Sequence, residues 1–436
     1  MEPVQSAIKI LRRVIPRTVL RPSECSIWVV MAFMVSLWVI WDEWAAFFLW
    51  LIAWSTISTS VTLPDFYNLY CEGKWWLSGA YMYSGTHVFT YPFAYPPSSL
   101  PFFGFFAQFD FGGAAQLWTA MGLAVFFVAL VSAAAVLRPA RRYLFVSIAA
   151  LLFFTSYALR AELQLGQINV LLAGLTILSL TAYRSKHSRV SATLLAAGAL
   201  LKGPPLLFLL YFVVFHRDFR YLLHFLESAV AILGVSLLVV PIQLYWIWMA
   251  NVFPTLFVST ALPTSVSVAG AVSLSNLSYF TPRVFVAGTC MFAAFAYRIC
   301  PNSLTKVAGQ SSVAADAMFL MNSLVILLLG TRSWPQDYVW VLIPTALFLS
   351  ALLVENANTY YFIVVGLAAF LFNFEPYPLF LYYLAQYDII GSFIPQTQIL
   401  LPTALIGVLL MASCLALLFI RPQTILKCPP QPTLAA

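Results

Sequence analysis

The carboxylate of Asp65 stands where an apolar segment ends, within the run Leu63-Pro64-Asp65-Phe66-Tyr67. A partly desolvated carboxylate in such a place could act as the general base that removes a proton from a hydroxyl nucleophile. The alternative is a structural role, as the N-cap of a short helix that begins at Phe66. This position at the end of an apolar segment makes Asp65 the first candidate for a catalytic residue and leaves both roles open.

Glu72 follows Asp65 by seven residues and lies on the same face if this stretch is helical. There it could contact a bound substrate or pair with Lys74. A solvated carboxylate in a loop is the simpler interpretation of the same residue. The sequence leaves both interpretations of Glu72 open.

A second polar group follows Arg160 and Glu162, in the run Gln164-Leu165-Gly166-Gln167-Ile168-Asn169 at the end of an apolar segment. The amides of Gln167 and Asn169 could hydrogen-bond the hydroxyl groups of a ligand, and the guanidinium of Arg160 could bind a phosphate. Helix capping together with an Arg160–Glu162 ion pair would explain the same pattern.

Lys202 interrupts an apolar hairpin, within Lys202-Gly203-Pro204-Pro205. A lysine at such depth must face a cavity or a charged partner, and a lipid phosphate is a natural partner. The alternative is a lysine whose ammonium group reaches the membrane surface from the hairpin tip.

The segment Tyr91–Pro97 cannot be a membrane span, because its three prolines lack N–H donors and fix φ. A rigid aromatic loop, with Tyr95 near its centre, suits contact with a sugar ring or a lipid. An aromatic belt at the membrane interface has the same composition.

Further polar residues gather late in the chain. Arg332, Trp334 and Asp337 share one short segment between apolar runs. Asn276-Leu277-Ser278 is formally a glycosylation sequon, but in this context we interpret Asn276 as part of the site region. Asp110 is isolated and is interpreted as structural.

The composition excludes a soluble chain. Of 436 residues, 62% are hydrophobic and 8% are charged, and the mean hydropathy is +0.90, whereas soluble domains are about one half apolar and one quarter charged. Disorder requires the opposite composition. The net charge of +7 does not indicate nucleic-acid binding, because the basic residues form short clusters between apolar runs, as in cytoplasmic membrane loops. The six cysteines show no CxxC motif and no Cys/His cluster, and we interpret them as small apolar residues.

The apolar runs predict an all-α polytopic membrane protein of about 12 passes, with both termini inside and short interfacial helices in the outer loops. This count holds if the first two runs make one crossing. We expect one membrane domain over 1–436, without internal repeats. It comprises a basic cytoplasmic N-terminus (1–22), an outer loop with Asp65 (64–114), a second outer loop (243–283) and a cytoplasmic tail (421–436).

Several chemistries lack their motifs. The chain has no P-loop, no HExxH, no GxSxG and no Cys/His metal spacing. We therefore expect no ATP hydrolysis, zinc chemistry or serine hydrolysis, and no cofactor or metal.

Taken in order, the motifs resemble the polyprenyl-phosphate-mannose-dependent α-1,2-mannosyltransferases, glycosyltransferase family 87 of the GT-C class. The resemblance spans roughly residues 44 to 345. The motifs that carry it are Asp65-Phe66 with Tyr70, Gly79-Ala80-Tyr81, Tyr95-Pro96-Pro97, Gly166-Gln167-Ile168-Asn169, Leu201-Lys202 before Pro204-Pro205, Asn276 with Ser278, and Ser333-Trp334.

The resemblance implies a GT-C-like transmembrane helix bundle with its active site on the outer face of the membrane. It implies a polyprenyl-phosphate-linked sugar donor, with mannose as the usual sugar, a glycolipid or glycan acceptor, and inversion at the anomeric carbon. Asp65 takes the position of the single base. Gln167, Asn169, Tyr95, Glu72, Asn276, Trp334 and Asp337 would line the sugar and acceptor pocket. Lys202, Arg160 and Arg332 would hold the donor phosphate.

The chain departs from the family pattern in two places. Pro335-Gln336-Asp337 stands where the family often carries a His pair, and Asn276-Leu277-Ser278 replaces the usual Asn-Gln-Ser. Both departures bear on the identity of the acceptor and of the sugar, and neither touches Asp65. Two other hypotheses remain: a transporter of lipids or lipid-linked sugars with its site at the break around Lys202, and a non-catalytic relative that binds glycolipid.

Overall fold

A computed structural model describes residues 63–79, 94–257, 281–299, 311–329, 335–354, 359–373 and 409–417. All regular structure in these ranges is helical, which confirms the predicted all-α class. The N-terminal 62 residues, and with them the first two apolar runs, lie outside the described residues.

The first half of the described chain contains α4 (Pro64–Leu77), η2 (Pro97–Ser99), α5 (Leu100–Phe106), α6 (Phe111–Ala135), α7 (Pro139–Thr155), α8 (Tyr157–Leu165), α9 (Asn169–Arg184) and α10 (Ser188–Leu201). The second half contains η3 (Pro204–Phe208), η4 (Leu210–Phe215), α11 (Phe219–Leu237), α12 (Ile242–Ile247), η5 (Trp248–Val252), η6 (Phe253–Phe257), α14 (Thr281–Ile299), α15 (Ser311–Leu329), η8 (Pro335–Tyr338), α16 (Val339–Val354) and α17 (Thr359–Asn373).

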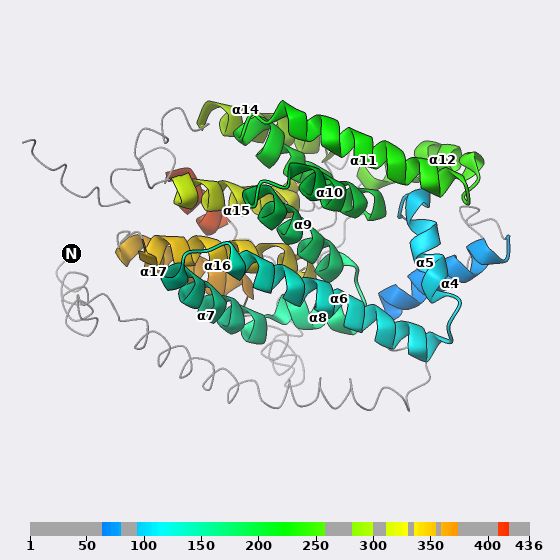
Figure 1. Cartoon of the computed structure of the whole chain (residues 1–436), viewed down its shortest axis with the longest axis horizontal. Helices are drawn as coiled ribbons and strands as arrows, with labels where there is room; N and C mark the ends of the chain where they lie inside the picture. The colour runs from blue at the N-terminus through cyan, green and yellow to red at the C-terminus, as the bar shows by residue number, and fades with distance from the viewer. Residues whose placement is uncertain are drawn as a thin grey trace, which may run out of the picture.

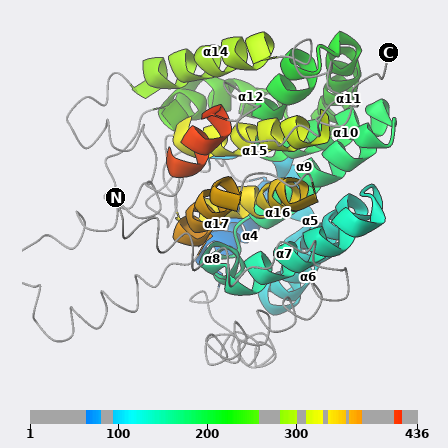
Figure 2. The ribbon, with the colours of Figure 1, turned by 90° about the vertical axis from the view of Figure 1, so that its left-hand side faces the viewer.

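The long helices form a bundle, and the short helices α4 and α5 lie together at one end of it (Figure 1). Helix α9 packs against both α6 and α10, and α10 packs against α11. On the other side, α14, α15, α16 and α7 contact one another in that order, as Figure 2 shows from the end of the bundle. The α4–α5 end is the end at which the candidate site lies.

Small residues bring α6 and α9 close together. The buried face of α6 carries Ala115, Gly122 and Ala129 at seven-residue spacing. Opposite them, a Cβ added at Gly174 would lie 2.9 Å from the Val125 side chain and 3.2 Å from the Phe126 backbone. Close approach through small residues is typical of helices that pack in membranes, and this contact fixes where α9 begins.

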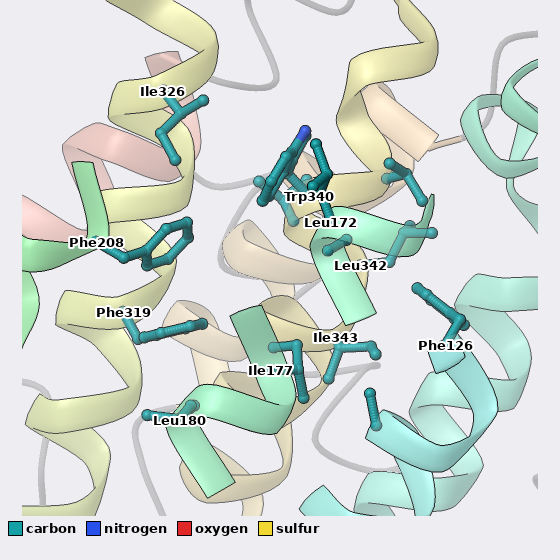
Figure 3. Close-up of a cluster of buried hydrophobic side chains, with 14 of the residues drawn as sticks. Phe126, Leu172, Ile177, Leu180, Phe208, Phe319, Ile326, Trp340, Leu342 and Ile343 are labelled. Atoms are coloured by element: carbon teal, nitrogen blue, oxygen red, sulfur yellow. The ribbon is translucent and has the colours of Figure 1, made fainter. Parts of the chain in front are cut away.

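The centre of the bundle is apolar. Side chains from α6, α9, η3, α15 and α16 meet there (Figure 3), and the labelled ones are Phe126, Leu172, Ile177, Leu180, Phe208, Phe319, Ile326, Trp340, Leu342 and Ile343. All ten are buried. This core holds the starts of α9 and α16 in fixed register.

A buried ion-pair cluster joins four helices at the opposite end of the bundle from α4. Asp316 of α15 accepts hydrogen bonds from Arg141 of α7 and Arg184 of α9. Arg141 also donates to the Leu347 carbonyl at 2.8 Å and to Ser350 Oγ at 3.3 Å, both on α16. Asp316 is 1% exposed. The cluster clamps the start of α7 and the end of α9, far from the start of α9.

Two described helices, α6 and α11, are long and apolar enough to cross a membrane. The pair α7 and α8, bent by 58°, would add a third span if it is one broken helix. Six other apolar helical stretches of 10–17 residues fall below that length. The apolar helices confirm the membrane class, whereas the expected total of about 12 passes and the inside placement of both termini stay predictions. The outer loops that we expected at 64–114 and 243–283 are partly helical, because α4, α5, α12, η5 and η6 lie within them.

Candidate active site

The turn between α8 and α9 and the start of α4 fit together around Gly166. This glycine ends α8 with φ +70°, in the left-handed region that favours glycine. A Cβ there would lie 2.6 Å from the Cβ of Phe66 and 3.0 Å from that of Leu63. Trp118 of α6 donates to the Gly166 carbonyl at 3.0 Å and stacks on the Phe66 ring. Asp65, between Leu63 and Phe66, is thereby placed against Gln167.

Asp65 and Gln167 meet through their side chains. Gln167 Nε2 donates to Asp65 Oδ2 across 102 positions of sequence. Asp65 lies in the first turn of α4 and Leu63 is the N-cap, so the interpretation of Asp65 as an N-cap before Phe66 is wrong. Burial raises the pKa of Asp65, although the hydrogen bond from Gln167 and the charge of Lys202 lower it. A carboxylate with a raised pKa is a better general base at neutral pH.

Asn169 is the centre of a second group of polar residues. Its Nδ2 donates to Glu162 Oε1 at 2.8 Å and to Asp337 Oδ1 at 2.7 Å. Its Oδ1 accepts from Lys202 Nζ at 2.9 Å. Asn169 and Glu162 are 1% and 0% exposed. Both amide hydrogens of Asn169 are therefore in use, and the amide holds two carboxylates and one ammonium group in fixed positions.

Lys202 ends α10 in an extended conformation, directly before the prolines of η3. Its ammonium lies over the ring of Tyr95, 5.7 Å from the ring centroid. Ser98 Oγ donates to the Leu200 carbonyl at 2.7 Å and ties the short η2 turn to the end of α10. The break predicted at Lys202 is confirmed, and Lys202 faces polar partners inside the protein.

The polar face of α4 extends from Asp65 through Asn68 to Glu72, three and seven residues on. Glu72 is 6% exposed, so the interpretation as a solvated loop carboxylate is wrong. Next to it, α4 packs closely on α5, where a Cβ at Gly73 would lie 2.6 Å from the Phe103 carbonyl oxygen. Burial raises the pKa of Glu72 to about 8. Asn68 Oδ1 and Glu72 Oε2 are buried without a hydrogen-bond partner among the described residues.

The structure thus brings Asp65, Gln167, Asn169, Lys202, Tyr95 and Asp337 together. Arg160 is half-buried on α8. Arg332, Trp334 and Asn276 lie outside the described residues. Asp110 is the N-cap of α6, accepting from the Gly113 N–H at 3.0 Å, which confirms its structural interpretation. Within the described ranges, no group of His, Cys, Asp and Glu side chains could hold a metal ion.

Sequence reasoning placed Glu162 near the site but gave it no role there. Its contact with Asn169 crosses the Gly166 turn, and a turn of this kind is not visible in periodicity. The available signal was a carboxylate seven residues before an amide, at the end of an apolar segment. Gly166 and Trp118 were also missed as supporting residues, because their partners Leu63 and Phe66 are distant in sequence.

The model of glycosyltransferase family 87 matches residues 93–328, more than half of the chain. The chain belongs to glycosyltransferase family 87. Family membership and the apolar helices together indicate a membrane glycosyltransferase. No curated protein matches the chain. The matched region contains Gln167, Asn169 and Lys202 but neither Asp65 nor Asp337, so the geometry alone joins these two carboxylates to the family core.

Proposed function

We propose that this glycosyltransferase moves a hexose, mannose by the family resemblance, from a polyprenyl-phosphate donor to a hydroxyl of a glycolipid or glycan acceptor, with inversion. The observation that supports it is the approach of a half-buried carboxylate, Asp65, to a polar cluster that contains a half-buried lysine, Lys202. The site would face the outer side of the membrane, at the end of the bundle opposite to the Arg141–Asp316–Arg184 cluster.

In the proposed reaction, Asp65 removes the proton of the acceptor hydroxyl. The hydroxyl oxygen forms a bond to the anomeric carbon while the bond from that carbon to the donor phosphate breaks. The polyprenyl phosphate leaves with the electron pair of that bond. Among the described residues, the hydrogen bond that Asp65 accepts comes from the neutral amide of Gln167, which positions the carboxylate without the full charge neutralisation that an ion pair brings.

Charge balance decides which residues must hold the donor phosphate. Lys202 contacts Asn169 and Tyr95. The Asn169 amide in turn hydrogen-bonds the carboxylates of Asp337 and Glu162. One lysine among several carboxylates leaves no surplus positive charge for an anionic leaving group. We therefore assign further cations to the phosphate, Arg160 and Arg332. Asn169, Tyr95, Asp337, Asn276 and Trp334 are assigned to the sugar.

The polar face of α4 is assigned to the acceptor. Glu72 and Asn68 each carry a buried oxygen without a hydrogen-bond partner, and the hydroxyls of an acceptor sugar would supply the missing donors. Seven residues of helix place Glu72 about 10 Å along α4 from Asp65. In this assignment, the reacting hydroxyl of the acceptor lies at Asp65 and another part of the acceptor lies at Glu72.

The test is transfer by purified protein in lipid nanodiscs, with radiolabelled polyprenyl-phosphate-mannose, a glycolipid extract, and GDP-mannose as the alternative donor. Asp65→Asn can still accept from Gln167, so it should fold and lose about 10²–10⁴-fold in rate. Asp110→Asn is the matched control, because Asn caps a helix as well as Asp does, and it should retain activity.

Each outcome has a consequence for the proposal. Product from the lipid-linked donor alone, lost in Asp65→Asn, supports donor class and base together. Product that survives in Asp65→Asn removes the assignment of the base. No product from any donor, combined with flux of the labelled lipid between leaflets of proteoliposomes, would establish the transporter hypothesis instead.

A further inference from the structure

Glu162 contacts both halves of the candidate site, and the proposed mechanism gives it no role. We propose that Glu162 is a positioning residue that sets the donor-binding lysine Lys202 relative to the base Asp65, acting through Asn169. The inference rests on the proposed function, since it concerns how that site holds its donor. Its support comes from the backbone and from the side chain of this one residue.

The backbone of Glu162 shapes the turn that carries Gln167. Its carbonyl oxygen accepts from the Gly166 N–H and, at 3.0 Å, from the Gln167 N–H. Two bonds to one carbonyl close the end of α8 around the left-handed Gly166. Gln167 emerges from this turn toward Asp65. These bonds use no side-chain atom, so every substitution at Glu162 keeps them.

The side chain of Glu162 acts on the other half of the site. Glu162 Oε1 and Asp337 Oδ1 each accept one of the two Nδ2 hydrogens of Asn169. These two acceptors fix the orientation of the Asn169 amide, because a 180° flip would turn its oxygen toward both carboxylates. The unflipped amide presents Oδ1 to Lys202 Nζ. Without Glu162, Asp337 alone orients the amide.

The burial of Glu162 argues for a role in the site more than for one in stability. The residue is 0% exposed, and its Oε2 has no hydrogen-bond partner in the part of the chain that the structure describes. A carboxylate in that position costs free energy that an apolar side chain of similar size would not. Glu162 also lines the same small cavity as Gln167, between α6 and the α8–α9 turn. Glu162 therefore lies between Gln167, which contacts Asp65, and Asn169, which contacts Lys202.

The experiment compares Glu162→Gln with Glu162→Leu in nanodiscs. Donor KM and kcat are measured from slow hydrolysis of polyprenyl-phosphate-mannose without acceptor, and acceptor KM from transfer. A glutamine oxygen can still accept from Asn169, so Glu162→Gln should stay within about threefold of wild type. Glu162→Leu should raise donor KM about tenfold, the effect of one lost oriented contact, with acceptor KM unchanged. Glu227→Gln and Glu227→Leu, at an exposed glutamate on α11, are the matched controls.

A double variant tests the route through Asn169. If Glu162 acts through Asn169, then Glu162→Leu combined with Asn169→Leu should raise donor KM no further than Asn169→Leu alone. Additive effects would overturn the proposal, as would equal losses in Glu162→Gln and Glu162→Leu, or unchanged donor KM in both. A fall in thermal stability without a change in donor KM would assign Glu162 a structural role only. If wild type neither hydrolyses nor transfers from the donor, the proposed function itself fails, which is a separate result.

Discussion

Replacement of Gly166 by alanine should move Asp65 away from Gln167 without unfolding the bundle. The new Cβ would lie 2.6 Å from the Phe66 Cβ, whereas carbon atoms in contact are about 3.5–4.0 Å apart. The start of α4 would have to move by about 1 Å. A residue other than glycine at φ +70° costs a further 1–2 kcal/mol, approximately. Because Asp65 lies next to Phe66, the displacement acts directly on the Asp65–Gln167 contact.

A displacement of about 1 Å can cost on the order of 10²-fold in rate. We therefore expect Gly166→Ala to lose about 10²-fold in kcat/KM for transfer, with an apparent Tm lowered by several degrees. Gly79→Ala is the matched control, since Gly79 also has positive φ, +74°, but a Cβ there would contact none of the described residues within 4 Å. The control should share part of the loss in Tm and keep its activity. Full activity in Gly166→Ala, or equal losses in both variants, would refute the reasoning about the close approach of α4.

Two further predictions concern stability. Burial raises the pKa of Glu72 to about 8, so the folded state binds a proton that the unfolded chain releases above about pH 4.5. Glu72 should lower stability by at most about 1.4 kcal/mol per pH unit as the pH rises from 5 to 8. Thermal unfolding of Glu72→Gln should show a shallower decline than wild type, because Asp65, whose pKa is also raised, still contributes; parallel curves for both proteins would contradict it. Asp316→Asn leaves the buried Arg141 and the half-buried Arg184 without their carboxylate and should cost about 3–5 kcal/mol, whereas Glu227→Gln, at a side chain that is 67% exposed, should leave Tm unchanged.

Local sequence signals were sufficient for part of the site. The sequence indicated a short helix near Asp65, although α4 begins at Pro64 and not at Phe66, as suits a proline and an acidic residue in a first helical turn. The break after Leu201 followed from Gly203 and the two prolines, which cannot continue a helix. The amides of the Gly166–Asn169 segment fell at the start of α9, as the apolar pattern indicated.

The parts that sequence reasoning missed depend on contacts between distant segments. Glu72 is buried on α4, and no local pattern distinguishes a buried carboxylate from one in a solvated loop. Glu162 joins the site because the chain reverses at Gly166. Helix length was also misleading, since α9 has 16 residues while a perpendicular crossing needs about 20. The number of membrane passes therefore does not follow from apolar runs alone, because it also depends on the tilts and breaks of the helices.

The two charged clusters of the bundle are built differently, and the difference bears on function. At one end, Asp316 is held directly between two guanidinium groups, and a carboxylate so committed serves to join four helices. At the other end, neutral amides separate the charges: Gln167 stands before Asp65, and Asn169 stands between Lys202 and two carboxylates. Amides fix positions while they leave a carboxylate available as a base and an ammonium available to a ligand. That contrast is the physical reason to place the chemistry at the Asp65 end.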